Sequence, residues 1–588
     1  MGVVPGHASR PPRSLAWWWL VPLVLVVGWL AALGGDALHL RDDAALLRQH
    51  AAAAKVAVED RDIAALAVEV SALGDASDSF SQHSSGPHWW LAAHIPWLSD
   101  QVGPLRAAGD AVAGLTEGAL RPLAELDGLE GLSSPEFVDG RIDPLILEPY
   151  RPTLLAAADA VHAEQDALDQ VDLSGTISQV VGSFEDLRAD VESVGEILDN
   201  AGALAELLPS MLGADGQRTY VVILQNNAEP RATGGIPGAV IEVAVTDGRL
   251  QLGQYYSAAD LNVPDVPVAP LRDDELALFS ENMALYVQNA TYTPEFARTG
   301  ELVAAYVERA TGRRIDGVIS IDPVALGYML EGTPAREVSG VTISGDNFAD
   351  VMLRDAYSIF PNPADQDEFF AVASAALFGD VVSGGDSTVA GAQRALTEGR
   401  FAVWSDDAAE QAILETTRAG GDFLSRTSTA GVFLNDGSGS KIGYYAQTEV
   451  EGSLRVCAAS GETIDGVLTV TVSHTYDGLV EDLPAYVSGG GVYVAPGRFE
   501  ANLVVYPPAG MSVSKLTANG EAAGLRALQH GARLATSTRV ALEPGQTVTL
   551  RYELIPVEAG SQWEGIVITP GATPQVHLGT VEEHSEAC

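Results

Sequence analysis

The chain has 588 residues, 47% of them hydrophobic and 19% charged, so it can bury several cores and is not a largely disordered chain. Its 79 acidic and 33 basic residues give a formal charge of −46, which repels phosphate backbones and argues against nucleic-acid binding. Two cysteines are too few for a zinc ribbon, an iron–sulfur site or a disulfide-dense miniature fold.

The first predicted element is a transmembrane helix at residues 15–33, where 19 residues, LAWWWLVPLVLVVGWLAAL, carry no charge. At about 1.5 Å per residue this helix spans about 28 Å, close to the hydrocarbon thickness of a bilayer. Two arginines precede the run, and three aspartates follow it closely. The positive-inside rule therefore predicts a cytoplasmic tail at residues 1–14 and an extracytoplasmic location for everything beyond the membrane.

A cleaved signal peptide is the alternative, because Ala32-Leu33-Gly34 forms a small-x-small site. The apolar run is longer than the ~7–15 residues usual in a signal peptide, which favours an uncleaved signal-anchor. No second run of comparable length follows in the sequence. We therefore predict a single-pass protein of the cell membrane that contacts the bilayer through residues 15–33.

Three regions follow the anchor, and together they predict a multidomain α+β fold. Residues 36–210 carry spaced apolar positions among charged ones, which predicts an extracytoplasmic helical stalk or bundle. Residues 211–430 alternate strands with helices and predict a mixed α/β core domain, in which strands at 219–225 and 238–245 flank a polar loop. Residues 440–588 contain strands of alternating pattern separated by glycine and proline, which predicts a C-terminal β-sandwich domain.

Both cysteines, Cys457 and Cys588, lie in the region of the predicted sandwich. In an oxidising compartment they can form a disulfide that ties the C-terminus to an early strand. Two independent buried thiols are the alternative.

Known catalytic and cofactor motifs are missing from the sequence. There is no phosphate-binding P-loop, so no nucleotide is predicted, and there is no G-x-S-x-G, H-E-x-x-H, G-x-G-x-x-G or EF-hand motif. The histidines are scattered without the spacing of metal ligands. Ser438 and Lys441 formally match S-x-x-K, but they lie in a glycine-rich turn and lack the companion motifs of penicillin-binding enzymes. We therefore predict no catalytic residue, no metal site and no cofactor.

The polar loop after the strand at 219–225 is the candidate ligand-binding site. Ligands collect outside the carboxyl ends of strands in α/β sheets, glycines allow close backbone approach, and an arginine fork suits carboxylate or phosphate. The alternative is a structural loop in which the arginine pairs with the nearby glutamate. The candidate residues come from this loop and from two later loops: Asn226, Asn227, Glu229, Arg231, Gly234, Gly235, Asp260 and Asn289.

The segment TYVVILQNNAEPRATGGIPGAVIEVAVTDGRL resembles the core signature of the bacterial family called domain of unknown function 4012. Similar features are GPHWWLAAHIPWLSDQVGPLRAAGDAV in the helical region, IDGVISIDPVAL in the α/β region and LNDGSGSKIGYYAQTEVE before the sandwich. The resemblance implies a membrane-anchored, extracytoplasmic protein connected with the cell envelope or exopolysaccharide. It implies no particular activity.

A fainter similarity links the chain to the LytR–CpsA–Psr envelope glycopolymer transferases, which combine one membrane helix with an α/β domain around a lipid pyrophosphate. Their R-x-D-T motif is replaced here by Arg231-Ala232-Thr233-Gly234, and Glu229 would have to stand in for a metal-binding aspartate. Arg354 is the nearest counterpart of their later arginine-rich motif.

Two functions follow as hypotheses. The first is a non-enzymatic, membrane-anchored binding or assembly factor whose partners are a surface glycopolymer, an exopolysaccharide or envelope proteins. The second is a transferase that acts on lipid-pyrophosphate-linked glycan and uses Mg²⁺, with Arg231 on phosphate and Glu229 or Asp260 on the metal.

Overall fold

The computed structural model describes residues 20–59, 63–84, 87–92, 94–126, 141–263, 265–383, 386–458, 460–574 and 579–588. The chain divides into two compact units. Unit 1 comprises Met1–Ser133 and Ile146–Glu206, and unit 2 comprises Ser134–Leu145 and Leu207–Cys588. The predicted cytoplasmic tail, residues 1–14, lies outside the described residues, as do residues 15–19 of the predicted membrane helix.

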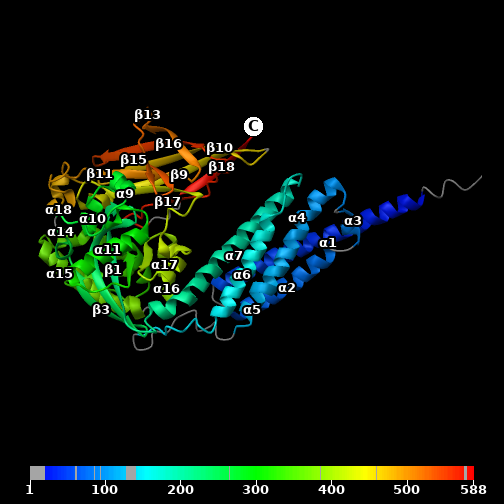
Figure 1. The fold of residues 1–588 in the computed structure, drawn as a ribbon, viewed down its shortest axis with the longest axis horizontal. Helices are drawn as coiled ribbons and strands as arrows, with labels where there is room; N and C mark the ends of the chain where they lie inside the picture. The colour runs from blue at the N-terminus through cyan, green and yellow to red at the C-terminus, as the bar shows by residue number, and fades with distance from the viewer. Residues whose placement is uncertain are drawn as a thin grey trace, which may run out of the picture. The chain divides into compact units, whose positions relative to one another are not determined.

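Unit 1 is built from helices, drawn in blue to cyan in Figure 1. Its helices are α1 (Leu20–Glu59), α2 (Ile63–Ser84), α3 (Pro87–Ala92), α4 (Pro96–Leu115), α5 (Arg121–Ala124), α6 (Arg151–Asp169) and the first part of α7 (Ser178–Met211). The sequence pattern explains their packing, since the buried positions of α6 recur at helical spacing: Leu154, Ala157, Ala158, Val161 and Leu168. All of these except Leu154 share one core with Ala111 of α4 and Phe184 and Val191 of α7.

The predicted transmembrane helix is not supported by the structure. The backbone of residues 20–33 forms the beginning of α1. Among the described residues, no helix is both long enough and apolar enough to cross a bilayer.

The first half of unit 2 is a five-stranded mixed sheet with the order β3-β2-β1-β4-β7. Its strands are β1 (Arg218–Arg231), β2 (Gly234–Thr246), β3 (Arg249–Tyr256), β4 (Gly317–Ile321) and β7 (Phe401–Ser405). β1 runs parallel to β4, whereas the pairs β1–β2, β2–β3 and β4–β7 are antiparallel. A separate hairpin is formed by β5 (Arg336–Val338) and β6 (Val341–Ile343).

Helices cover both faces of this sheet because β1 is apolar on both sides. Val221 and Ile223 share a core with α11, while Val222 and Leu224, on the opposite face, pack against α12 and α16. The helices of this half are α8 (Ala258–Leu261), α9 (Asp273–Phe279), α10 (Asn282–Leu285), α11 (Phe296–Thr311), α12 (Pro323–Met329), α13 (Phe348–Asp350), α14 (Ala356–Ile359), α15 (Pro363–Ser383), α16 (Asp386–Thr397) and α17 (Ala408–Glu415).

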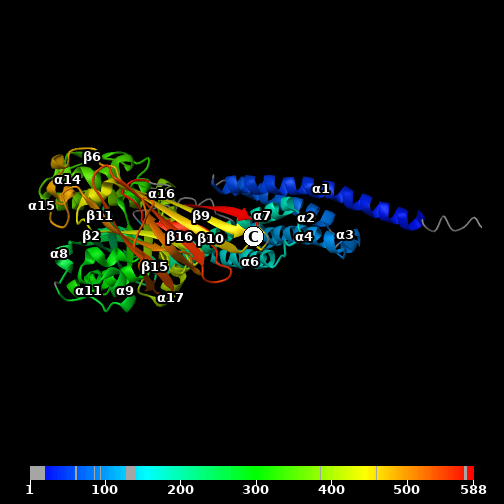
Figure 2. The same ribbon diagram turned by 90° about the horizontal axis from the view of Figure 1, so that it is seen from above.

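The second half of unit 2 is a sandwich of two sheets, drawn in yellow to red in Figures 1 and 2. One sheet has the order β13-β12-β16-β10-β9-β18, and the other β14-β15-β11-β8-β17. The strands are β8 (Thr429–Asp436), β9 (Ala446–Cys457), β10 (Thr463–His474), β11 (Phe499–Tyr506), β12 (Met511–Ala518), β13 (Glu521–Ala522), β14 (Ala527–His530), β15 (Arg533–Leu542), β16 (Thr547–Pro556), β17 (Gly565–Ile568) and β18 (Thr580–Glu586), and a short α-helix, α18 (Ala485–Ser488), lies between β10 and β11.

The alternation of apolar and polar residues along a strand determines which side chains point into the core between the two sheets. In β10, Leu468, Val470 and Val472 are fully buried in the core between the sheets, and the threonines between them face outward. The last strand, β18, pairs in parallel with β9, and Cys588 forms the predicted disulfide with Cys457, with 5.6 Å between their Cα atoms. The structure thus confirms the mixed α+β fold class and the cysteine pair.

Candidate functional site

The predicted polar loop at residues 226–235 is instead the end of a β-hairpin. β1 and β2 stay paired from Arg218↔Val245 to Arg231↔Gly234, with irregularities after Leu224 and Asn226. The prediction of a loop was wrong because it followed from the polar residues alone, whereas the side chains of Asn226, Asn227 and Glu229 are bonded to other parts of unit 2. Gly235 is required in this hairpin, since a Cβ at this position would lie 2.1 Å from the Asn226 carbonyl oxygen.

The tip of this hairpin is bonded to the sandwich. The Ala232 amide donates to Asn435 Oδ1 (3.1 Å), and the Ala232 carbonyl accepts from Thr569 Oγ1 (3.3 Å). Asn435 in turn donates to the Tyr292 carbonyl (3.0 Å). Residues that are far apart in the sequence therefore fix the position of the hairpin.

Glu229 and Lys441 form a buried ion pair between the hairpin and the sandwich, with 2.5 Å between Lys441 Nζ and Glu229 Oε1. Tyr357 and Tyr486 each place a ring centroid 4.8 Å from the ammonium. Burial alone would raise the pKa of Glu229, but the charge of Lys441, its hydrogen bond and the charge of Arg231 together hold that pKa below its usual value. Burial would likewise lower the pKa of Lys441, and Glu229 and the tyrosines raise it instead.

Arg231 is buried and bonded to its surroundings. Its guanidinium donates to the carbonyls of Pro230 (3.0 Å) and Asp436 (3.3 Å) and to Asn289 Oδ1 (3.4 Å), and it lies over the Tyr292 ring at 4.8 Å. The structural alternative for this loop included an ion pair between Arg231 and Glu229. Arg231 lies instead within 4.0 Å of the Asp436 carboxylate, and the partner of Glu229 is Lys441.

Asp436 is a buried carboxylate with a raised pKa. Burial raises the pKa of Asp436 to about 6, against the opposing effects of Arg231 and of hydrogen bonds from Ser438 and Gly439. Since its folded-state pKa exceeds its unfolded-state value, the folded state binds the extra proton between about pH 4 and pH 6. Ionising Asp436 therefore lowers the stability of unit 2 as the pH rises through this window.

We expect Asp436→Asn to remove this loss of stability. The free energy of unfolding of the wild type should fall between pH 4 and pH 6 relative to that of the variant, because only the wild type ionises a buried carboxylate. Urea unfolding at several pH values measures the difference between the two proteins. A constant difference across the window would contradict the prediction.

The remaining predicted residues separate into two groups. Asn226 donates to the Tyr357 hydroxyl (2.8 Å), and Asn227 donates to Asp322 Oδ2 (2.9 Å) and to the Pro570 carbonyl (3.1 Å). Asp260 lies apart from this group, because it caps α8 through the amide and hydroxyl of Ser257 (2.8 and 2.7 Å). These two hydrogen bonds lower the pKa of Asp260.

A cavity of about 330 Å³ lies beside the hairpin, between the end of the α/β sheet and the sandwich. Gln225, Thr233 and Ser320 border it, and four phenylalanines form much of its apolar wall: Phe296, Phe401, Phe423 and Phe433. Residues Thr569, Pro570 and Gly571, which follow β17, line the cavity from the sandwich side. We call residues 569–573 the C-terminal strap.

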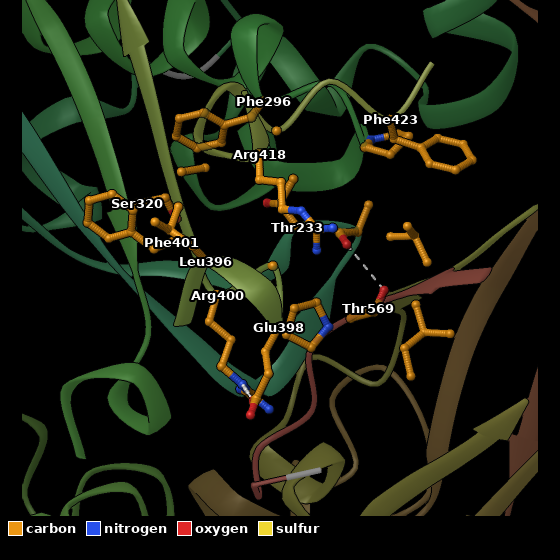
Figure 3. Close-up of a pocket in the computed structure, with 18 of the residues that line it drawn as sticks. Thr233, Phe296, Ser320, Leu396, Glu398, Arg400, Phe401, Arg418, Phe423 and Thr569 are labelled. Atoms are coloured by element: carbon orange, nitrogen blue, oxygen red, sulfur yellow. Dashed lines mark hydrogen bonds and ion pairs between the residues drawn. The ribbon is translucent and has the colours of Figure 1, made fainter. Parts of the chain in front are cut away.

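Four arginines and one carboxylate line this cavity: Arg394, Arg400, Arg418, Arg426 and Glu398. Figure 3 shows Arg418 extending toward the middle of the cavity near Thr233, with Phe296 and Phe423 on the upper side and Arg400 beside Glu398 on the lower side. Arginines therefore outnumber carboxylates among the lining residues, in a chain with a formal charge of −46.

Arg400 anchors the floor of the cavity and is almost fully buried. Its guanidinium pairs with Asp322 (2.7 Å) and Glu398 (2.7 Å) and donates to the strap carbonyls of Gly571 (2.9 Å) and Thr573 (3.2 Å). Asp322 also caps α12 by accepting from the Ala325 amide. With its charge neutralised by Asp322 and Glu398, Arg400 is a structural residue. Arg418 and Arg426 also line the cavity.

Sequence reasoning missed these arginines. They fall between residues 394 and 426, on or after three different elements, and no short motif joins them. Only the fold brings α16, β7 and the segment after α17 to the same space. Within the described parts of the chain, no group of three or more His, Cys, Asp or Glu side chains could hold a metal ion.

Comparison with protein families gives one match: residues 215–357 fit the model of a family described as "Protein of unknown function (DUF4012)". This segment covers β1 to β6 and α8 to α13 and ends within α14, and the cavity arginines lie beyond it. Searches of curated proteins and of solved structures found no match. The similarity to LytR–CpsA–Psr transferases is not shown by these comparisons.

Proposed function

We propose that the protein is a binding factor for an acidic surface glycopolymer, on the basis of the cavity in unit 2. The DUF4012 model that matches residues 215–357 describes a family of unknown function, so it assigns no reaction to the chain. Its site is the cavity of unit 2. In this proposal, residues 15–33 anchor the chain in the cell membrane and the two units lie outside the cell.

The single observation that supports this proposal is the composition of the cavity wall. Phenylalanine faces can pack against the C–H faces of sugar rings, and arginine forks suit the carboxylate or phosphate of an acidic sugar. A volume of about 330 Å³ is at the low end of the range for ligand pockets, ~300–1,000 Å³. The cavity therefore takes a short unit of the polymer, not an extended stretch.

The contacts of Glu229, Arg231 and Asp260, the residues considered for the transferase reaction, favour binding over catalysis. Glu229 is neutralised by Lys441, Arg231 is bonded to backbone carbonyls, and Asp260 caps a helix. In these positions they connect parts of unit 2, and no observation on them favours the Mg²⁺-dependent transferase.

We expect Arg418→Gln to weaken the binding of acidic oligosaccharides by about tenfold, the loss of one partly solvated charge-assisted contact. Binding of the full chain to a panel of acidic and neutral bacterial oligosaccharides, measured by calorimetry or on an array, checks this result. Neutral oligosaccharides should bind the wild type and the variant equally weakly.

Arg526→Gln is the matched control, because Arg526 is an exposed arginine of unit 2 that does not line the cavity. This variant should bind like the wild type. If no acidic oligosaccharide binds better than its neutral counterpart, or if both variants bind alike, the proposed function fails.

A further inference from the structure

The corner between α3 and α4 in unit 1 exposes large apolar side chains. Trp90 and Trp97 are 62% and 65% exposed, and Leu91 and Ile95 are 45% and 37% exposed. Isolated exposed apolar residues are ordinary, but four within eight residues form a patch that calls for a partner. We call this patch the α3–α4 corner.

The α3–α4 corner is fixed to one level of α1 by side chains that face inward. Trp29 of α1 donates to the His88 carbonyl (3.0 Å), and Asp36 of α1 pairs with His88 Nε2 (2.5 Å) and accepts from Trp89 Nε1 (3.2 Å). The hydrogen bond from His88 lowers the pKa of Asp36. Trp89 also lies in a core with Leu40 of the same helix.

This level is where the apolar run of α1 ends. The uncharged stretch runs to Leu33, between the two α1 residues that hold the corner, Trp29 and Asp36. At about 1.5 Å per residue, each of them lies within about 6 Å of that end along the helix axis. If residues 15–33 occupy the bilayer, the exposed tryptophans lie at its outer surface.

We infer that the α3–α4 corner dips into the headgroup region of the bilayer that holds residues 15–33, so that unit 1 contacts lipid at a second place. This inference rests on the membrane anchor in the proposed function and adds a contact to it. Tryptophan favours this depth because its large ring is apolar and its N–H remains hydrogen-bonded to the interface. The partner is a zwitterionic lipid surface, since a chain with a charge of −46 is repelled by anionic headgroups.

The test uses the full chain in phosphatidylcholine nanodiscs, with a nitroxide attached at Trp90→Cys, Leu91→Cys or Trp97→Cys. The two native cysteines are bonded to each other, so the introduced thiol is the labelling site. We expect the labels to lie about 5–10 Å below the headgroup surface, measured from their relative accessibility to oxygen and to a nickel chelate.

Val68→Cys on α2 is the matched control, because Val68 is 65% exposed in the same unit. Its neighbour Glu69 pairs with His50, so this position lies about 20 Å along α1 from Asp36 and its label should be aqueous. If the chain enters nanodiscs but the corner labels are as aqueous as the label at residue 68, the inference is overturned and the anchor stands. If the chain does not enter nanodiscs, both are overturned, whereas glycan binding by unit 2 is unaffected.

Discussion

Replacing Lys441 with methionine is expected to lower the free energy of unfolding of unit 2 by about 3–5 kcal/mol. The substitution leaves Glu229 in a buried position without its counter-charge, and the pKa of Glu229 should rise from its present low value. Urea unfolding followed by pulsed hydrogen exchange measures this effect, because it reports on peptides of unit 2 separately from those of unit 1.

An exposed ion pair in the same sandwich provides the control. Lys515 and Glu553 lie 3.0 Å apart, with side chains 55% and 37% exposed, so Lys515→Met should cost less than about 1 kcal/mol. The double variant Lys441→Met with Glu229→Gln should recover part of the lost stability, since no unpaired charge remains. Equal effects of Lys441→Met and Lys515→Met would mean that burial does not strengthen the first pair.

Breaking the Cys457–Cys588 disulfide is expected to lower the stability of unit 2 by about 5 kcal/mol in the chain-entropy model, because the bond closes a loop across 131 positions. Cys588→Ser and Cys457→Ser should have the same effect, since either removes the bond. The loss should appear first as faster hydrogen exchange in β18, which lies at the edge of its sheet and pairs with β9.

Mass spectrometry of the unreduced protein gives the direct check on this bond. A protein that holds the disulfide has no thiol to alkylate, and adding reductant should reproduce the stability of the serine variants. Two alkylatable thiols in the unreduced protein, or serine variants as stable as the wild type, would show that the bond does not hold the C-terminus.

The fold could be predicted where local pattern decides it. Alternation in β10, the helical spacing in α6 and the apolar strand at residues 219–225 each indicate their element without information from elsewhere in the chain. The hairpin at residues 226–235 could not be predicted in this way. Its polar residues are bonded to partners such as Lys441 and Asp436, which lie more than 200 positions away.

The candidate ligand site predicted at the end of β1 stays a prediction, and the structure adds a cavity next to it. The segment Glu229-Pro230-Arg231 suggested a site because it places two opposite charges close together. In the structure, these charged side chains bond instead to Lys441 and to the Asp436 carbonyl, both in unit 2. Arg418 and Arg426, which line the cavity, occur in unremarkable sequence, and only sheet topology brings them next to Gln225 and Thr233. Residue type alone does not separate a charged residue that bonds distant parts of unit 2 from one that lines the cavity.

The C-terminal strap has a consequence for how the protein is made. The α/β sheet is synthesised first, but Arg400 obtains two of its acceptors, the carbonyls of Gly571 and Thr573, only after another 171 and 173 residues have been added. Before that point in synthesis, one wall of the cavity is missing. The cavity therefore forms only after the strap has left the ribosome.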